Sequence, residues 1–238
     1  MTVAEFSPGL VLRGVPEPGD PGQGLVLKPS LFVKDVKPLV LGAPGDTLIV
    51  PAQLDARSQL LQSGDQGSSD ECVGHAMAGM LEFWNWKYLG RTVHIDPHQI
   101  YVRAKEIDGI KQAGTTLAAG FQAAQDLKLM PPLHTSLIRE ISNWWEIQRA
   151  LHLYTMVLGA FEITDKWMEA TADGWVRPGG KVLGGHACLI CGFSNAGPEP
   201  FFEWQGSWGP QGWRGFNRMS IDLFKEQFQY GLVAHWPG

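Results

Sequence analysis

The chain has 238 residues, a formal net charge of −5 and a hydrophobic content of 44%, values typical of a soluble globular protein. The acidic balance and the lack of a basic stripe argue against a nucleic-acid-binding function. No apolar run approaches the ~18 residues that span a bilayer, so we expect no membrane partner.

Cysteine usage indicates a reducing compartment. The sequence holds three cysteines, Cys72, Cys188 and Cys191, and an odd, small number does not build a disulfide framework. The start, M-T-V-A-E-F, lacks the basic and apolar regions of a secretory signal peptide. We therefore predict a cytoplasmic protein.

The first 53 residues are rich in proline and glycine, with V-P-E-P-G-D-P-G-Q-G at residues 15–24. This composition excludes long helices and favours extended or turn structure. We predict an N-terminal arm over residues 1–53 that packs against one domain over residues 54–238. A second hypothesis is that this arm shields a cleft.

Apolar residues at three- and four-residue spacing predict a helix that begins near Cys72 and ends before Gly90, which suits a left-handed cap. Ser69 or Asp70 can cap its start. Unpaired N–H groups and the positive end of the helix dipole favour a thiolate at Cys72. Gln66, six positions earlier, can direct its amide at the same point. The apolar face consists of Ala76, Met77, Met80, Leu81 and Trp84.

Further helices and then strands follow in chain order. Helices are predicted over residues 96–107, from residue 115 or 116 to residue 127, and over residues 142–153. From residue 155 the texture changes to β-branched and apolar runs without helical spacing. Strands are predicted over residues 155–164, 186–193, 201–205 and 215–219. A helical half followed by a small antiparallel sheet is an α+β arrangement.

Three motifs occur in one order along the chain: Q-G-S-S-D-E-C at Gln66–Cys72, G-G-H-A-C-L-I-C-G-F at Gly184–Phe193 and S-W-G-P-Q-G-W-R-G-F at Ser207–Phe216. Together they resemble the nucleophile, catalytic-histidine and Ser-Trp-Gly segments of papain-like cysteine peptidases. The resemblance is closest to bacterial and viral members without disulfides. It implies the papain-like fold, in which a cysteine-bearing helix packs against an antiparallel sheet and the active site lies in the groove between them.

The resemblance also implies roles for individual residues. Cys72 would be the nucleophile, His186 the base, and the Gln66 amide with the Cys72 backbone N–H the oxyanion hole. Gly114, Gly185 and Trp208 would border the substrate. The implied reaction is cleavage of peptide bonds through a thioester on Cys72, with a peptide or protein as substrate and no cofactor.

One position departs from the family pattern. Papain-like enzymes orient the catalytic histidine with an asparagine directly before Ser-Trp-Gly, and this chain has Gly206 there. Strand alternation turns the neighbouring Gln205 to the opposite face. Gly206, with Val73 where an aromatic residue is usual, supports an alternative reading as a catalytically impaired binding module. A thiol amidase that acts on cell-wall peptides or isopeptide bonds is a further alternative.

Two other patterns receive structural interpretations. Cys188 and Cys191 form C-x-x-C, a spacing used for zinc or redox chemistry. On a strand, positions three apart face opposite sides, so we expect core residues and no metal. His75, one helical turn after Cys72, is interpreted as a buried structural histidine.

Overall fold

The computed structural model describes residues 37–38, 49–130 and 138–234 of the chain. Most of the predicted N-terminal arm, residues 1–36 and 39–48, lies outside the described residues. Its described parts join the sheet: β1 (Lys37–Pro38) pairs with a strand of the domain, and β2 (Gln53–Asp55) crosses the predicted boundary at residue 53. None of the helices among the described residues is long and apolar enough to cross a membrane.

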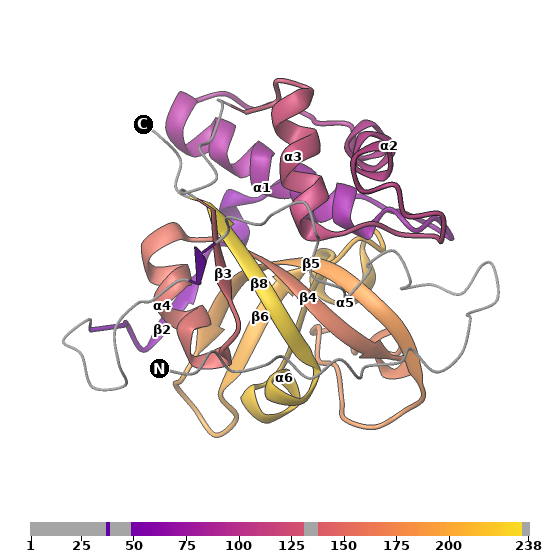
Figure 1. Ribbon diagram of the computed structural model, residues 1–238. Helices are drawn as coiled ribbons and strands as arrows, with labels where there is room; N and C mark the ends of the chain where they lie inside the picture. The colour runs from indigo at the N-terminus through magenta and orange to yellow at the C-terminus, as the bar shows by residue number, and fades with distance from the viewer. Residues whose placement is uncertain (1–36, 39–48, 131–137, 235–238) are drawn as a thin grey trace, which may run out of the picture.

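Three helices precede the main strands, as the sequence predicts (Figure 1). They are α1 (Cys72–Leu89), α2 (Pro97–Asp108) and α3 (Leu117–Asp126). Gly90 and Gly109 end the first two helices with φ of 60° and 62°, a left-handed conformation that suits glycine. The α2 and α3 starts are capped by Asp96 and Thr116, whose side chains accept backbone N–H bonds.

The start of α1 differs from the prediction. Its N-cap is Glu71, with no side-chain cap, instead of Ser69 or Asp70. The Glu71 carboxylate contacts His98 Nδ1 at 2.8 Å on α2, so it is turned away from the free N–H groups of α1. The backbone N–H groups in the first turn of α1 therefore have no side-chain cap, and Cys72 occupies the first helical position.

Within the described residues the sheet has eight strands, in the order β1-β3-β8-β4-β5-β6-β7, and β2 pairs separately with β5. All pairings are antiparallel except that of β1 with β3. The strands not yet given are β3 (Ile138–Ile141), β4 (Val157–Thr164), β5 (Val182–Ser194), β6 (Phe201–Gln205), β7 (Phe216–Ser220) and β8 (Phe228–Ala234).

The predicted four-strand sheet was too small. Two of the strands after α3 were not predicted. One is β3, whose four residues include two charged ones, and the other is β8, which follows α6 (Ile221–Gln227) without turn residues. Because β3 precedes α4 (Trp144–Tyr154), the division into a helical half and a later sheet half is not strict along the chain. The α+β class and the papain-like arrangement of helix and sheet are confirmed.

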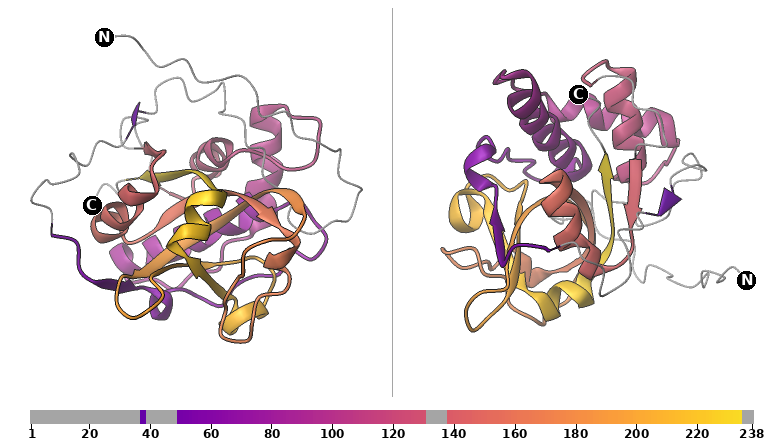
Figure 2. Two further views of the ribbon diagram at one scale, coloured as in Figure 1. Left: turned by 90° about the horizontal axis from the view of Figure 1, so that it is seen from below. Right: turned by 90° about the vertical axis from the view of Figure 1, so that its left-hand side faces the viewer.

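The sheet separates two hydrophobic cores. One face packs against α1, α2 and α3, which lie on one side of the sheet in Figure 1 and in the right-hand view of Figure 2. The opposite face packs against α4 and α6. Helix α1 is buried along most of its length because it lies between the sheet and its neighbouring helices. This position places the start of α1 directly against β5.

Candidate active site

Cys72 lies where the start of α1 meets β5. Its side chain is fully buried, and its Sγ accepts a hydrogen bond from the Ala187 N–H at 3.4 Å. His186 precedes Ala187 on the same strand. The fold therefore brings the predicted nucleophile to the strand residue next to the predicted base, although the two are far apart in the sequence.

The protonation state of Cys72 differs from the expectation. Burial, with a smaller contribution from the charge of Asp70, raises the pKa of the Cys72 thiol to about 12. The hydrogen bonds from backbone N–H groups, including that of Ala187, act in the opposite direction and are outweighed. The prediction that the helix start favours a thiolate was wrong for this buried state, because desolvation of the charge exceeds the help of the donors.

His186 is also fully buried. Its ring stacks on Trp208, with centroids 4.3 Å apart and planes 15° apart, and meets the edge of Trp167 at 6.0 Å. Neither ring nitrogen has a hydrogen-bond partner among the described residues. Burial, with a smaller effect of His75, lowers the pKa of His186 to about 3. Cys72 and His186 are therefore both neutral at pH 7.

The Gln66 side chain is held in one orientation. The Ser207 hydroxyl donates to Gln66 Oε1, Gln66 Nε2 donates to the Ser69 carbonyl, and the Gln66 N–H donates to the Ser207 carbonyl at 2.8 Å. An amide nitrogen has two hydrogens, so one donor of Gln66 is left for a ligand. Ser207 was missed by the sequence analysis, although it belongs to the Ser-Trp-Gly motif.

Gly206 occupies an ordinary backbone conformation. Its N–H donates to the Gly215 carbonyl at 3.0 Å, and its carbonyl accepts from Ser63 Oγ at 2.5 Å. Its φ is not among the positive values, so the backbone itself does not require glycine. Gln205 faces away, as predicted: its Nε2 donates to the Leu61 carbonyl at 2.7 Å on the α1 side of the sheet.

The three residues expected to border the substrate differ in their surroundings. Trp208 covers the His186 ring. Gly185 is buried within β5, opposite Glu162 of β4. Gly114 is buried with φ of 81°, and its carbonyl accepts from Lys105 Nζ at 2.8 Å. The carbonyl of Gly114 therefore already has a partner within the protein.

The two cysteines of the C-x-x-C pair point to opposite faces of the sheet, as predicted. Cys188 belongs to the core on the α4 side, and Cys191 to the core on the α1 side. Burial raises the pKa of both thiols well above the usual value. Across the residues that the structure describes, no group of three or more His, Cys, Asp or Glu side chains could hold a metal ion. His75 is half-buried beside Gly64.

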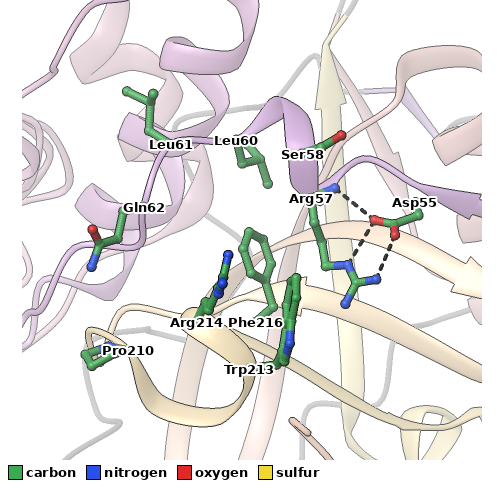
Figure 3. A pocket seen from close by; sticks show the side chains of 10 residues that line it. All are labelled: Asp55, Arg57, Ser58, Leu60, Leu61, Gln62, Pro210, Trp213, Arg214 and Phe216. Carbon is green, nitrogen blue, oxygen red and sulfur yellow. Dashed lines mark hydrogen bonds and ion pairs between the residues drawn. The ribbon is translucent and has the colours of Figure 1, made fainter.

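A hollow of about 660 Å³ lies beside β2 and the segment after Trp208 (Figure 3). At the edge of this hollow the Arg57 guanidinium lies over the Trp213 ring, 4.5 Å from its centroid, and is paired with Asp55 at 2.7 Å and Glu203 at 2.9 Å. None of the predicted site residues lines this hollow. Its lining is Asp55, Arg57, Ser58, Leu60, Leu61, Gln62, Pro210, Trp213, Arg214 and Phe216.

A helix with cysteine at its first position, packed on an antiparallel sheet that carries histidine, defines the papain-like α+β fold, and the chain has this fold. The structure is similar to that of xylellain, a cysteine protease from Xylella fastidiosa, with a TM-score of 0.73 and 14% identity over 94% of this chain and 99% of that chain.

Two procathepsin structures also have this fold. Procathepsin L2 from Tenebrio molitor larval midgut has a TM-score of 0.68 and 17% identity over 90% of this chain and 78% of that chain. Procathepsin B S9 from Trypanosoma congolense has a TM-score of 0.67 and 11% identity over 89% and 85%. No family model and no curated protein matches the chain in sequence.

Proposed function

We propose that the chain is a papain-like thiol hydrolase, a cysteine peptidase in which Cys72 is the nucleophile and His186 the base. The observation that carries the proposal is the hydrogen bond from Ala187 N–H to Cys72 Sγ, because it fixes the strand of His186 against the thiol. The structures that share the fold are those of a cysteine protease and of procathepsins, which supports peptide bonds as the substrate class.

The reaction proceeds through two displacements. Cys72 Sγ attacks the peptide carbonyl carbon while His186 accepts the thiol proton, and this proton then passes to the leaving amine as the C–N bond breaks. Water next attacks the resulting thioester, which releases the acid and returns the thiol. Because burial keeps both groups neutral, the thiol proton moves as the substrate is attacked instead of beforehand.

The developing oxyanion receives two donors in this scheme. One is the Cys72 backbone N–H at the uncapped start of α1, and the other is the remaining hydrogen of Gln66 Nε2. Ser207 holds the Gln66 amide nitrogen on the correct side by donating to its oxygen. Preorganised donors of this kind typically account for a factor of about 10²–10³ in rate.

Digestion of a peptide library by wild type and by Cys72→Ala tests the proposal. We expect cleavage by wild type alone, with loss of activity in His186→Ala. A parallel digest of cell-wall peptides distinguishes a peptidase from a thiol amidase. Equal cleavage by wild type and Cys72→Ala contradicts the proposal.

A catalytically impaired binding module is the second candidate. Gly206 and the unpaired nitrogens of His186 support it, since no side chain at the third position fixes the imidazole. The two candidates make opposite predictions for thiol chemistry: a module of this kind binds peptide without forming a thioester. Mass spectrometry of wild type mixed with an activated peptide ester separates them, because only the hydrolase gains an acyl mass on Cys72.

A further inference from the structure

His186 and Asn217 are two buried polar side chains with unsatisfied atoms on one side of the sheet. Asn217 is 2% exposed, and its Oδ1 has no hydrogen-bond partner among the described residues, as is also true of both His186 nitrogens. Buried polar atoms in proteins nearly always have a partner in the protein or in ordered water. The His186 ring in particular is therefore expected to have a polar partner on this face.

The strand register places Gly206 between the two side chains. Ile190 of β5 pairs with Trp204 of β6, and Trp204 pairs with Asn217 of β7. Gly206 lies two residues beyond Trp204, and His186 lies four residues before Ile190, so the register sets His186, Gly206 and Asn217 along a diagonal across three neighbouring strands. Because side chains alternate along strands, all three positions are on the same face. Gly206 is thus the intervening position, and it contributes no side chain.

The Asn217 amide is enclosed by two glycines. A Cβ on Gly206 would lie 3.3 Å from Asn217 Nδ2, and a Cβ on Gly212 would lie 2.2 Å from Asn217 Oδ1. The second distance excludes any side chain at Gly212, whose φ is 68°. The amide oxygen is therefore directed at Gly212 and the amide nitrogen at the space beside Gly206.

We propose that Asn217 is the positioning residue for His186, replacing from β7 the amide that position 206 lacks, an inference that rests on the proposed function. The link is one water molecule beside Gly206. This water accepts a hydrogen bond from Asn217 Nδ2 and another from the His186 ring N–H that faces away from Cys72. It donates to the Gly215 carbonyl, which lies 3.8 Å from the Cβ position of Gly206.

This arrangement selects the useful tautomer. With one ring nitrogen donating to the water, the other is left as an acceptor for the Cys72 proton. A water with three polar partners is typical of buried sites in proteins. The same arrangement explains why an ordinary backbone position carries glycine, since an asparagine at position 206 would take the place of this water and crowd Asn217 Nδ2.

The test measures the tautomer of the His186 ring and moves the asparagine from position 217 to position 206. In protein labelled with ¹⁵N-histidine, we expect His186 to be a single tautomer in wild type and a mixture in Asn217→Ala. We expect kcat to fall by about 10-fold in Asn217→Ala with KM unchanged, and Gly206→Asn combined with Asn217→Ala to recover most of that loss. Asn85→Ala is the control, because the Asn85 side chain bonds to Leu81 within α1, away from this face.

Each outcome decides the proposal. A folded Asn217→Ala with an unchanged His186 tautomer overturns it. If Asn217→Ala does not fold, the wild-type protein provides the test. Its spectrum should show a water-relayed exchange peak between the His186 ring N–H and the Asn217 amide. The absence of this peak overturns the proposal. A wild type that cleaves nothing but shows the Asn217-dependent tautomer contradicts the peptidase function and leaves this inference intact.

Discussion

Burial of an ionisable pair determines how this site responds to pH. His186 is neutral in the folded chain because burial lowers its pKa to about 3, whereas an unfolded histidine has a pKa near 6.5. Below pH 6.5 the unfolded state therefore binds a proton that the folded state does not bind. Stability from this group is fully present above pH 6.5 and is lost as the pH falls towards 3.

We predict that wild type loses about 2 kcal/mol more unfolding free energy between pH 7 and pH 5 than His186→Gln, which lacks the titrating ring. Urea unfolding of both proteins at the two pH values measures the difference. Equal losses in the two proteins would mean that His186 is solvated in solution.

The Ser207–Gln66 contact supports a second prediction at the scale of residues. Ser207→Ala removes the hydroxyl that orients the amide, so kcat/KM for peptide cleavage should fall by about 10-fold, and Gln66→Ala should lower it by about 10²–10³. Because both changes act on one donor, the double variant should be no slower than Gln66→Ala. Additive losses would show that Ser207 acts independently of Gln66.

The sequence motifs identify Cys72, His186 and Gln66 as candidates, because each motif is local. Ser207 acts on Gln66 across 141 positions, and Asn217 reaches its neighbours only through strand pairing. Neither relation is visible without the register of β6 and β7. The only sequence signal for Asn217 is a polar amide in the run F-N-R-M of β7.

At the scale of elements, the four helices α1 to α4 were predictable because their ends carry distinct residues, such as Asp96-Pro97 and Gly109 for α2, whereas α6 was not predicted. Strand β6 was predicted with its observed bounds. By contrast, β3 is short and partly charged, and β8 continues directly from α6. Such strands exist because the sheet supplies their hydrogen bonds, and a single sequence does not encode that context locally.

The contact between α1 and α2 provides the prediction for elements. A Cβ on Gly74 would lie 2.3 Å from the Pro97 carbonyl oxygen, a backbone atom with little freedom to move. Gly74→Ala should therefore destabilise the chain by about 1–3 kcal/mol, despite the higher helix propensity of alanine. Val102→Ala on the exposed side of α2 is the control, with an expected change within about 0.5 kcal/mol. A Gly74→Ala variant more stable than wild type would contradict this packing.

At the scale of the whole molecule, the three buried cysteines lie in different packing layers. Cys72 lies where the helices meet the sheet, whereas Cys188 and Cys191 lie within the sheet itself, one in each core. Movement of the start of α1 away from β5 exposes Cys72, whereas exposure of Cys188 and Cys191 requires a wider opening of the α4-side and α1-side cores that cover them.

We therefore predict that iodoacetamide modifies Cys72 at least about 10-fold faster than Cys188 or Cys191 without denaturant. Peptide mapping by mass spectrometry at increasing urea concentrations measures the three rates. The rates should converge only where the whole chain unfolds. Similar rates for all three cysteines in the native protein would contradict the assignment of Cys72 to a site between the halves.

The most direct test of the peptidase assignment is the rate at which a peptidyl vinyl sulfone forms a thioether, because this electrophile needs both the nucleophile and the base. The peptidase assignment predicts a single adduct on Cys72 in wild type, formed about 100-fold more slowly in His186→Ala. An adduct on Cys188 or Cys191, or a Cys72 adduct that forms equally fast without His186, would contradict it.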